Sequence, residues 1–161
     1  MKLNLRINDY PISLDQDLNE EKLKSLNFRK ARFFDRMLVK PAKGEIVWWA
    51  KNCGLKYLND DFENTIYPIL DIKAGAKVMF GTSCYLWFKE NKLIKLTFQI
   101  IQNKMAAEIS LKKLEEKLVE VYGNPALSER PFITWTAENQ KFIIEYPQRM
   151  NGFIHLMNKN L

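Results

Sequence analysis

Residues Tyr85 to Ile101 read YLWFKENKLIKLTFQII, and this stretch decides the fold. Two runs of aromatic, aliphatic and β-branched residues, 85–89 and 92–101, flank the polar pair Glu90-Asn91, which is typical of a β-hairpin. The second run alternates apolar and polar residues, so one of its faces points to a core. We expect four residues to face that core: Ile94, Leu96, Phe98 and Ile100. We expect their polar neighbours to face water: Lys95, Thr97 and Gln99.

The same strand character recurs elsewhere in the chain. Phe132–Thr136 and Lys141–Tyr146 predict a second hairpin around residues 137–140, and Phe153–Met157 predicts a last strand. Phe33–Val39 and Ile46–Lys51, separated by a turn-forming segment with Pro and Gly, predict a third hairpin.

Two segments have the pattern of helices. From Ser110 to Tyr122 leucines recur at three- and four-residue spacing, Ser110 can cap the first turn, and Gly123 can end the helix. A shorter helix is predicted from Asp17 to Leu26, where Asp17 and Glu20 have capping-box spacing.

Because the strands arrive as hairpins and outnumber the helices, the sequence predicts an α+β fold: an antiparallel sheet built from hairpins with two helices packed on one face. No Ser- or Pro-rich linker divides the chain, so we expect a single globular domain over residues 1–161. An alternative is two subdomains, at about 1–60 and 61–161.

Composition excludes several classes of protein. A chain of 161 residues with 47% hydrophobic and 27% charged residues is neither disordered nor collagen-like. The first ten residues lack the apolar run of a secretory signal, and no stretch approaches the roughly 20 apolar residues of a membrane helix. Cys53 and Cys84 have no paired spacing, so we expect reduced, buried thiols in a cytoplasmic protein that does not bind membranes.

The sequence contains no recognisable catalytic or metal-binding pattern. Residues 75–83, GAKVMFGTS, fail the phosphate-loop spacing, and two cysteines with one histidine do not form a zinc motif. His155 is the default candidate for acid–base chemistry, but it lies in an alternating strand on the side of Phe153 and Met157. We therefore expect no catalytic residues, no metal and no cofactor.

Positive charge is concentrated in one segment. Residues 22–56 contain ten basic and two acidic residues, an excess of eight, whereas the whole chain carries +6. Aromatic residues are interleaved with these cations, and adjacent Trp48 and Trp49 cannot both face one core unless both faces of the sheet are covered. The predicted partner-binding residues are Arg29, Lys30, Arg32, Phe34, Arg36, Trp48, Trp49 and Lys51.

Three functional hypotheses follow from this basic-aromatic surface. In size and plan the chain is similar to the small α+β immunity and inhibitor proteins that accompany bacterial toxins. The first hypothesis is therefore a non-catalytic protein that docks on, and inhibits, a protein with an acidic face, such as a toxin. The alternative is a nucleic-acid-binding protein that uses the same surface. The third is an enzyme or ligand-binding protein with a pocket at His155 or at the acidic residues Asp60, Asp61 and Glu63.

Overall fold

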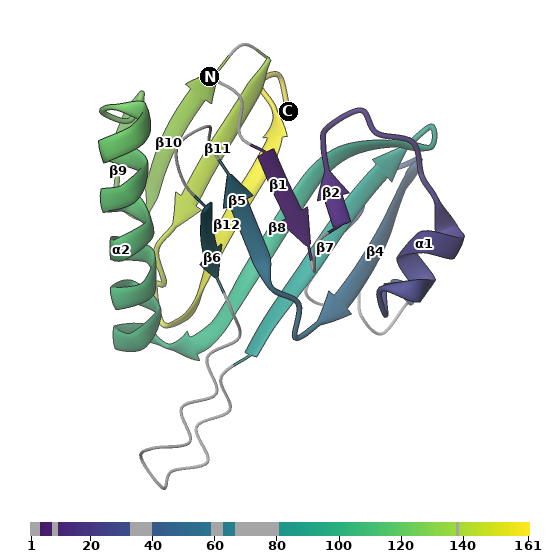
Figure 1. Ribbon diagram of the computed structural model, residues 1–161, viewed down its shortest axis with the longest axis horizontal. Helices are drawn as coiled ribbons and strands as arrows, with labels where there is room; N and C mark the ends of the chain where they lie inside the picture. Colours follow the sequence, from purple (N-terminus) through teal and green to yellow (C-terminus); the bar gives the residue numbers. More distant parts are fainter. Residues whose placement is uncertain (1–3, 8–9, 33–39, 59–62, 67–80, 138) are drawn as a thin grey trace, which may run out of the picture.

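The computed structural model describes residues 4–7, 10–32, 40–58, 63–66, 81–137 and 139–161. Within these residues the chain forms two antiparallel sheets and two helices (Figure 1), so the predicted antiparallel α+β fold is confirmed.

The larger sheet has eight strands and the smaller sheet has four. In spatial order the larger sheet contains β3 (Arg29–Lys30), β4 (Glu45–Lys51), β7 (Gly81–Lys89), β8 (Lys92–Asn103), β12 (Met150–Asn158), β11 (Gln140–Glu145), β10 (Phe132–Ala137) and β9 (Leu127–Glu129). The smaller sheet contains β2 (Tyr10–Ile12), β1 (Asn4–Ile7), β5 (Leu55–Leu58) and β6 (Glu63–Ile66). The helices are α1 (Glu20–Ser25) and α2 (Lys104–Tyr122).

The stretch that decides the fold forms strands β7 and β8, which pair along their length. Glu90 and Asn91 between them have φ of 51° and 62°. Two left-handed residues make the tight turn whose twist matches that of the strands. The strand register shifts once near this turn, and as a result Leu93 is fully buried while Ile94 is only half-buried. The predicted inward position of Ile94 is therefore wrong.

Helix α2 begins six residues before the predicted Ser110. The side chain of Asn103 accepts a hydrogen bond from the Ala106 amide (2.9 Å) and so caps the first turn. Its end agrees with the prediction, because Gly123 adopts a φ of 81° and its amide bonds to the Val119 carbonyl. Helix α1 is shorter than predicted and is capped by Asn19, not Asp17.

The smaller sheet and both helices lie over the same face of the larger sheet (Figure 1). One core cluster joins them to the larger sheet. It includes Leu5 and Ile12 from the smaller sheet, Leu23 from α1 and Leu111 from α2, together with Leu86, Phe98 and Ile154 from the larger sheet. The opposite face of the larger sheet carries a second, smaller cluster built from Val47, Trp49 and Tyr85, with Ala31 and Trp87 packed against it.

Other sequence-based expectations have mixed outcomes. The predicted strand Phe33–Val39 lies outside the described residues, and β4 pairs with β3 and β7. Thr97 and Gln99, expected to face water, are 4% and 6% exposed. They lie on the second face of the larger sheet, where Gln99 accepts a hydrogen bond from Tyr85 and Thr97 is hydrogen-bonded to His155. Neither α1 nor α2 combines the length and the apolar character that crossing a membrane requires.

Candidate functional site

The second face of the larger sheet, opposite the main core, carries the aromatic, charged and hydrogen-bonding side chains that could take part in binding or catalysis. Strand pairing places one residue from each of seven strands in a row across it, and no described residue of α1, α2 or the smaller sheet belongs to its apolar cluster. In spatial order this row contains Trp49, Tyr85, Thr97, His155, Ile143, Thr134 and Leu127. At the β3 end the row begins with Arg29, the register partner of Trp49.

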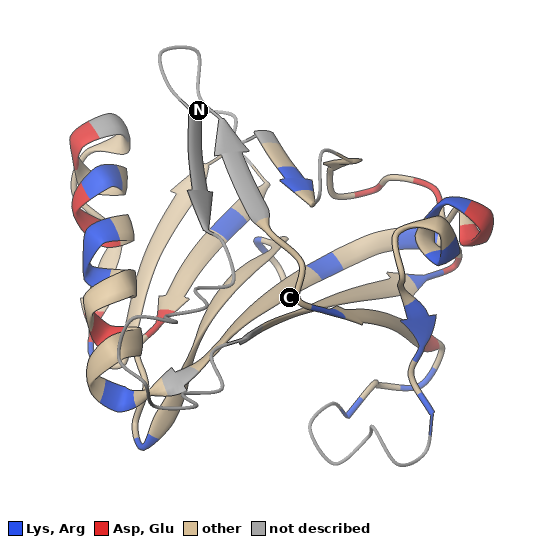
Figure 2. Ribbon diagram, turned by 60° about the horizontal axis from the view of Figure 1, so that its bottom comes forward, with Lys and Arg blue, Asp and Glu red and all other residues tan. Residues whose placement is uncertain are grey.

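A basic-aromatic cluster occupies the β3–β4–β7–β8 part of this face. We define it as Arg29, Trp49, Lys51, Tyr85, Trp87 and Lys95. Figure 2 marks the basic residues in blue, and several lie at the end of the molecule where Figure 1 shows α1 and β4.

Trp49 is the centre of the cluster. The Arg29 guanidinium lies 4.1 Å from the centroid of its ring, and Lys51 Nζ lies 5.3 Å from it. The Tyr85 ring stacks on Trp49 with 6.2 Å between centroids and 17° between planes. Because these side chains cover the indole, Trp49 is only 7% exposed, while Arg29 and Lys51 remain exposed.

Trp87 of β7 extends the cluster toward β8. Its ring lies 5.9 Å from that of Tyr85. Lys95 Nζ lies 4.9 Å from the Trp87 centroid. Burial lowers the pKa of Lys95, although Glu45 and Glu145 oppose this effect. This lysine is therefore a half-buried cation on an aromatic surface, in contrast to the exposed pair Arg29 and Lys51.

The structure brings together three of the eight predicted partner-binding residues: Arg29, Trp49 and Lys51. Lys30 and Arg32 are exposed, but Lys30 is the register partner of Trp48 and so points to the side of the strand opposite the cluster. Phe34 and Arg36 lie outside the described residues. Trp48 requires a correction, because its side chain points to the other side of β4 and is 3% exposed in the main core.

The adjacent tryptophans thus face opposite sides of the sheet, as alternation requires. Neither is exposed, because both faces of the sheet are covered at this position. Both indole nitrogens lack a hydrogen-bond partner.

Sequence reasoning missed Tyr85, Trp87 and Lys95. Alternation within 85–89 and 92–101 already places these residues on the polar side of the predicted hairpin. What the sequence did not show is that β4 pairs with β7, which places Tyr85 beside Trp49.

A polar relay includes two residues of this row, Thr97 and His155, and reaches Glu145 two residues further along β11. We define it as Thr97, His155 and Glu145, from three neighbouring strands. Thr97 Oγ1 is 2.8 Å from His155 Nδ1, and His155 Nε2 is 2.7 Å from Glu145 Oε2. A carboxylate oxygen accepts, so Nε2 carries a proton toward Glu145, and the Thr97 hydroxyl is the hydrogen-bond partner of Nδ1. The Phe153 ring stacks on His155 at 5.9 Å.

The family of the chain is now identifiable by comparison. A model of the TP0088 domain matches residues 63–160, which is more than half of the chain. The chain belongs to the TP0088 domain family. Its description states no activity, and neither a curated protein nor a solved structure matches the chain.

The matched residues of the TP0088 domain run from β6 through β12 and include α2. They contain the polar relay and the Tyr85, Trp87 and Lys95 part of the basic-aromatic cluster. Arg29, Trp49 and Lys51 lie before the matched residues, on strands β3 and β4, which extend the same sheet. The exposed cations of the cluster are therefore contributed from outside the matched part of the chain.

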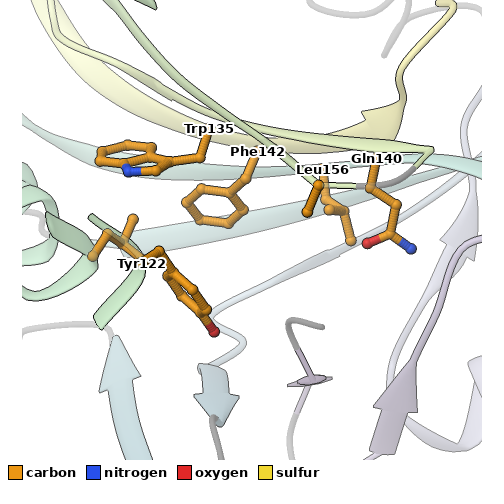
Figure 3. Close-up of a pocket in the computed structure, with 7 residues that line it drawn as sticks. Tyr122, Trp135, Gln140, Phe142 and Leu156 are labelled. Atoms are coloured by element: carbon orange, nitrogen blue, oxygen red, sulfur yellow. The ribbon is translucent and has the colours of Figure 1, made fainter. Parts of the chain in front are cut away.

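Two hollows lie in the TP0088 domain away from this face. One is a narrow apolar cavity of about 20 Å³, the room of roughly one water molecule. Figure 3 shows Tyr122 from α2 opposite Trp135 and Phe142 of the larger sheet. The second is an open groove along α2, where Met105 and Ile109 lie beside charged side chains and Arg130 stacks on the Tyr146 ring at 3.7 Å.

Neither hollow includes a residue of the polar relay. Of the acidic residues considered for a pocket, Asp60 and Asp61 lie outside the described residues. The part of the chain that the structure describes contains no group of three or more His, Cys, Asp or Glu side chains able to hold a metal ion.

Proposed function

We propose that this TP0088-domain chain is a docking protein that binds an acidic face of another protein through its basic-aromatic cluster. The observation that carries the proposal is the position of Arg29 and Lys51, both exposed and both held against the ring of Trp49. In this proposal the chain is non-catalytic, acts in the cytoplasm and inhibits its partner by covering it, as an immunity protein does.

Contact with the Trp49 ring favours binding because it already restricts the conformations of the Arg29 and Lys51 side chains in the unbound protein. Ordering a free side chain of this type at an interface costs about 0.5–1.5 kcal/mol. Contact with an aromatic ring at an exposed site offsets about 0.5–1 kcal/mol of that cost. Arg29 is the cross-strand neighbour of Trp49 and Lys51 follows Trp49 by two residues in β4, so both positive charges are presented to carboxylates from around one ring.

The same geometry favours a protein partner over single-stranded nucleic acid. A base that stacks on a protein needs an accessible ring face. Trp49 and Tyr85 are 7% and 6% exposed, so the groups offered to a partner are the cations and not the rings. Carboxylates of an acidic protein surface suit such cations.

The test compares two variants with the same change of charge. Arg29→Glu with Lys51→Glu reverses the two exposed charges of the cluster, and the control Lys24→Glu with Lys159→Glu reverses two exposed lysines elsewhere. Each protein is used to capture partners from a nuclease-treated lysate of the source cells at low salt, with quantification by mass spectrometry. We expect one protein to be retained by the wild type and the control and to be lost, more than tenfold, by the cluster variant.

A carbodiimide then tests the chemistry of the contact, because it joins a lysine directly to a carboxylate. We expect cross-links from Lys51 to Asp or Glu of that protein. Equal capture by both variants, with thermal unfolding unchanged, would contradict the proposal. Binding that disappears with nuclease and falls steeply with salt would instead establish the nucleic-acid alternative.

A further inference from the structure

Cys53 and Cys84 are 31 positions apart in the sequence and are neighbours in the structure. Cys84 lies in β7, where it pairs with Ala50 of β4. Cys53 follows β4, and its thiol donates to the Ala50 carbonyl (Sγ to O, 3.6 Å). Both side chains belong to the main core, with exposures of 1% and 0%. The two thiols lie close enough for each to affect the acidity of the other.

The segment that carries Cys53 is held against β7 by two further hydrogen bonds. The Asn52 amide donates to the Thr82 carbonyl (2.7 Å), and the Thr82 hydroxyl donates to the Cys53 carbonyl (2.6 Å). These bonds fix Cys53 beside Cys84. The residues that flank Cys53 in the chain, Asn52 and Gly54, are exposed and half-exposed.

The two sulfurs differ in acidity. The neighbouring Cys84 thiol lowers the pKa of the Cys53 thiol, whereas burial raises the pKa of Cys84. Cys53 is therefore the thiol that ionises first, and a thiolate is the form that reacts with oxidants.

We propose that Cys53 and Cys84 are a dithiol site that a two-electron oxidant of the hydroperoxide class converts reversibly to a disulfide. The Cys53 thiolate attacks one peroxide oxygen, the O–O bond breaks, and hydroxide leaves, which gives Cys53 sulfenic acid. The sulfur of Cys84 then attacks the Cys53 sulfur, the S–O bond breaks, and water leaves with the Cys84 proton. In total the two thiols lose two protons and two electrons, and hydrogen peroxide becomes two molecules of water. An external dithiol reverses the change by exchange.

The disulfide would join the segment between β4 and β5, which carries Cys53, to strand β7 of the larger sheet. The closed loop contains β5 and β6 of the smaller sheet. Covalent closure of a loop restricts the unfolded chain, so the oxidised protein should unfold at a higher temperature than the reduced protein.

The experiment exposes the full chain to hydrogen peroxide under native conditions. The protein is then unfolded in the presence of a thiol alkylating reagent, and its intact mass and Lys-C peptides are measured. We expect the oxidised protein to take up no alkyl group, to be lighter than the reduced protein by two hydrogens, and to contain one peptide pair joining Cys53 to Cys84. Dithiothreitol should restore two alkylation sites and the original melting temperature.

Two controls keep the experiment decisive. Cys84→Ala should leave Cys53 able to form a sulfenic acid, detected with a dimedone-type reagent, and unable to form the intramolecular disulfide. Peroxide treatment of the wild type in denaturant shows whether the Cys53–Cys84 disulfide forms in the folded protein or only after the chain has unfolded. Two alkylated cysteines after peroxide treatment, a disulfide that appears only in denaturant, or a disulfide between molecules would each overturn the proposal.

Discussion

Gly152 of β12 lies directly under Leu111 of α2, and adding one methyl group there probes how the helix packs on the sheet. A Cβ at position 152 would overlap Cδ1 of Leu111, lie 3.4 Å from its Cγ and lie 3.6 Å from the Glu145 carbonyl oxygen. Leu111 is fully buried, so it cannot turn into solvent. Overpacking of this kind costs about 1–3 kcal/mol, which is the destabilisation expected for Gly152→Ala.

A double-mutant cycle isolates this contact. Leu111→Ala alone should cost about 2–5 kcal/mol as a buried large-to-small change. In the double variant the methyl of position 152 enters space that Leu111 has left, so the total cost should be close to that of Leu111→Ala alone. The coupling between the two changes is then about 1–3 kcal/mol.

Urea unfolding followed by tryptophan fluorescence measures each free energy of unfolding. The matched control replaces Leu118, also buried on α2 and two helical turns away. Gly152→Ala with Leu118→Ala should be additive within about 0.5 kcal/mol. If Gly152→Ala is neutral, or if it is additive with Leu111→Ala, then α2 does not pack on β12 in the way described.

Two further predictions concern hydrogen-bonded side chains. Burial and the hydrogen bond to Glu115 raise the pKa of Tyr146 in the folded protein. The stabilisation that this shift gives to the folded state is therefore complete below the ordinary tyrosine pKa of about 10 and is lost as the pH rises above it. The urea midpoint of the wild type should therefore fall with alkaline pH more than that of Tyr146→Phe, and parallel pH profiles would contradict this. Thr97→Val removes the hydrogen-bond partner of His155 Nδ1 and should cost about 1 kcal/mol by urea unfolding. Thr134→Val in the same cross-sheet row is the control, and an equal effect of both changes would show that the relay adds no stability.

The order of the elements in the matched half of the chain follows from local sequence. Alternating residues in 92–101 predict a strand, and the polar pair before them predicts the turn that β7 and β8 form. Gly123 ends α2 because the left-handed conformation there has no steric cost for glycine. The sequence did not predict the start of α2, because Asn103 is both the last residue of strand β8 and the N-cap of the helix.

The candidate site was only partly predictable for a different reason. Alternation assigns Trp49, Tyr85 and Lys95 each to one side of its own strand, but it does not say which strands pair. Only the order β3-β4-β7-β8 places Arg29, Trp49 and Tyr85 in one row. The same order buries Thr97 and Gln99, which alternation alone assigned to water.

The sequence by itself determined the fold class, the central hairpin and the end of α2, because these depend on side-chain periodicity and on the backbone preferences of single residues. Tertiary structure decided which distant residues meet. Glu145 and Thr97 reach His155 only through the pairing of β8, β12 and β11, and Cys53 reaches Cys84 only because β4 lies beside β7. Such contacts depend on strand order and register, which are properties of the whole packed chain and are not encoded in any local segment.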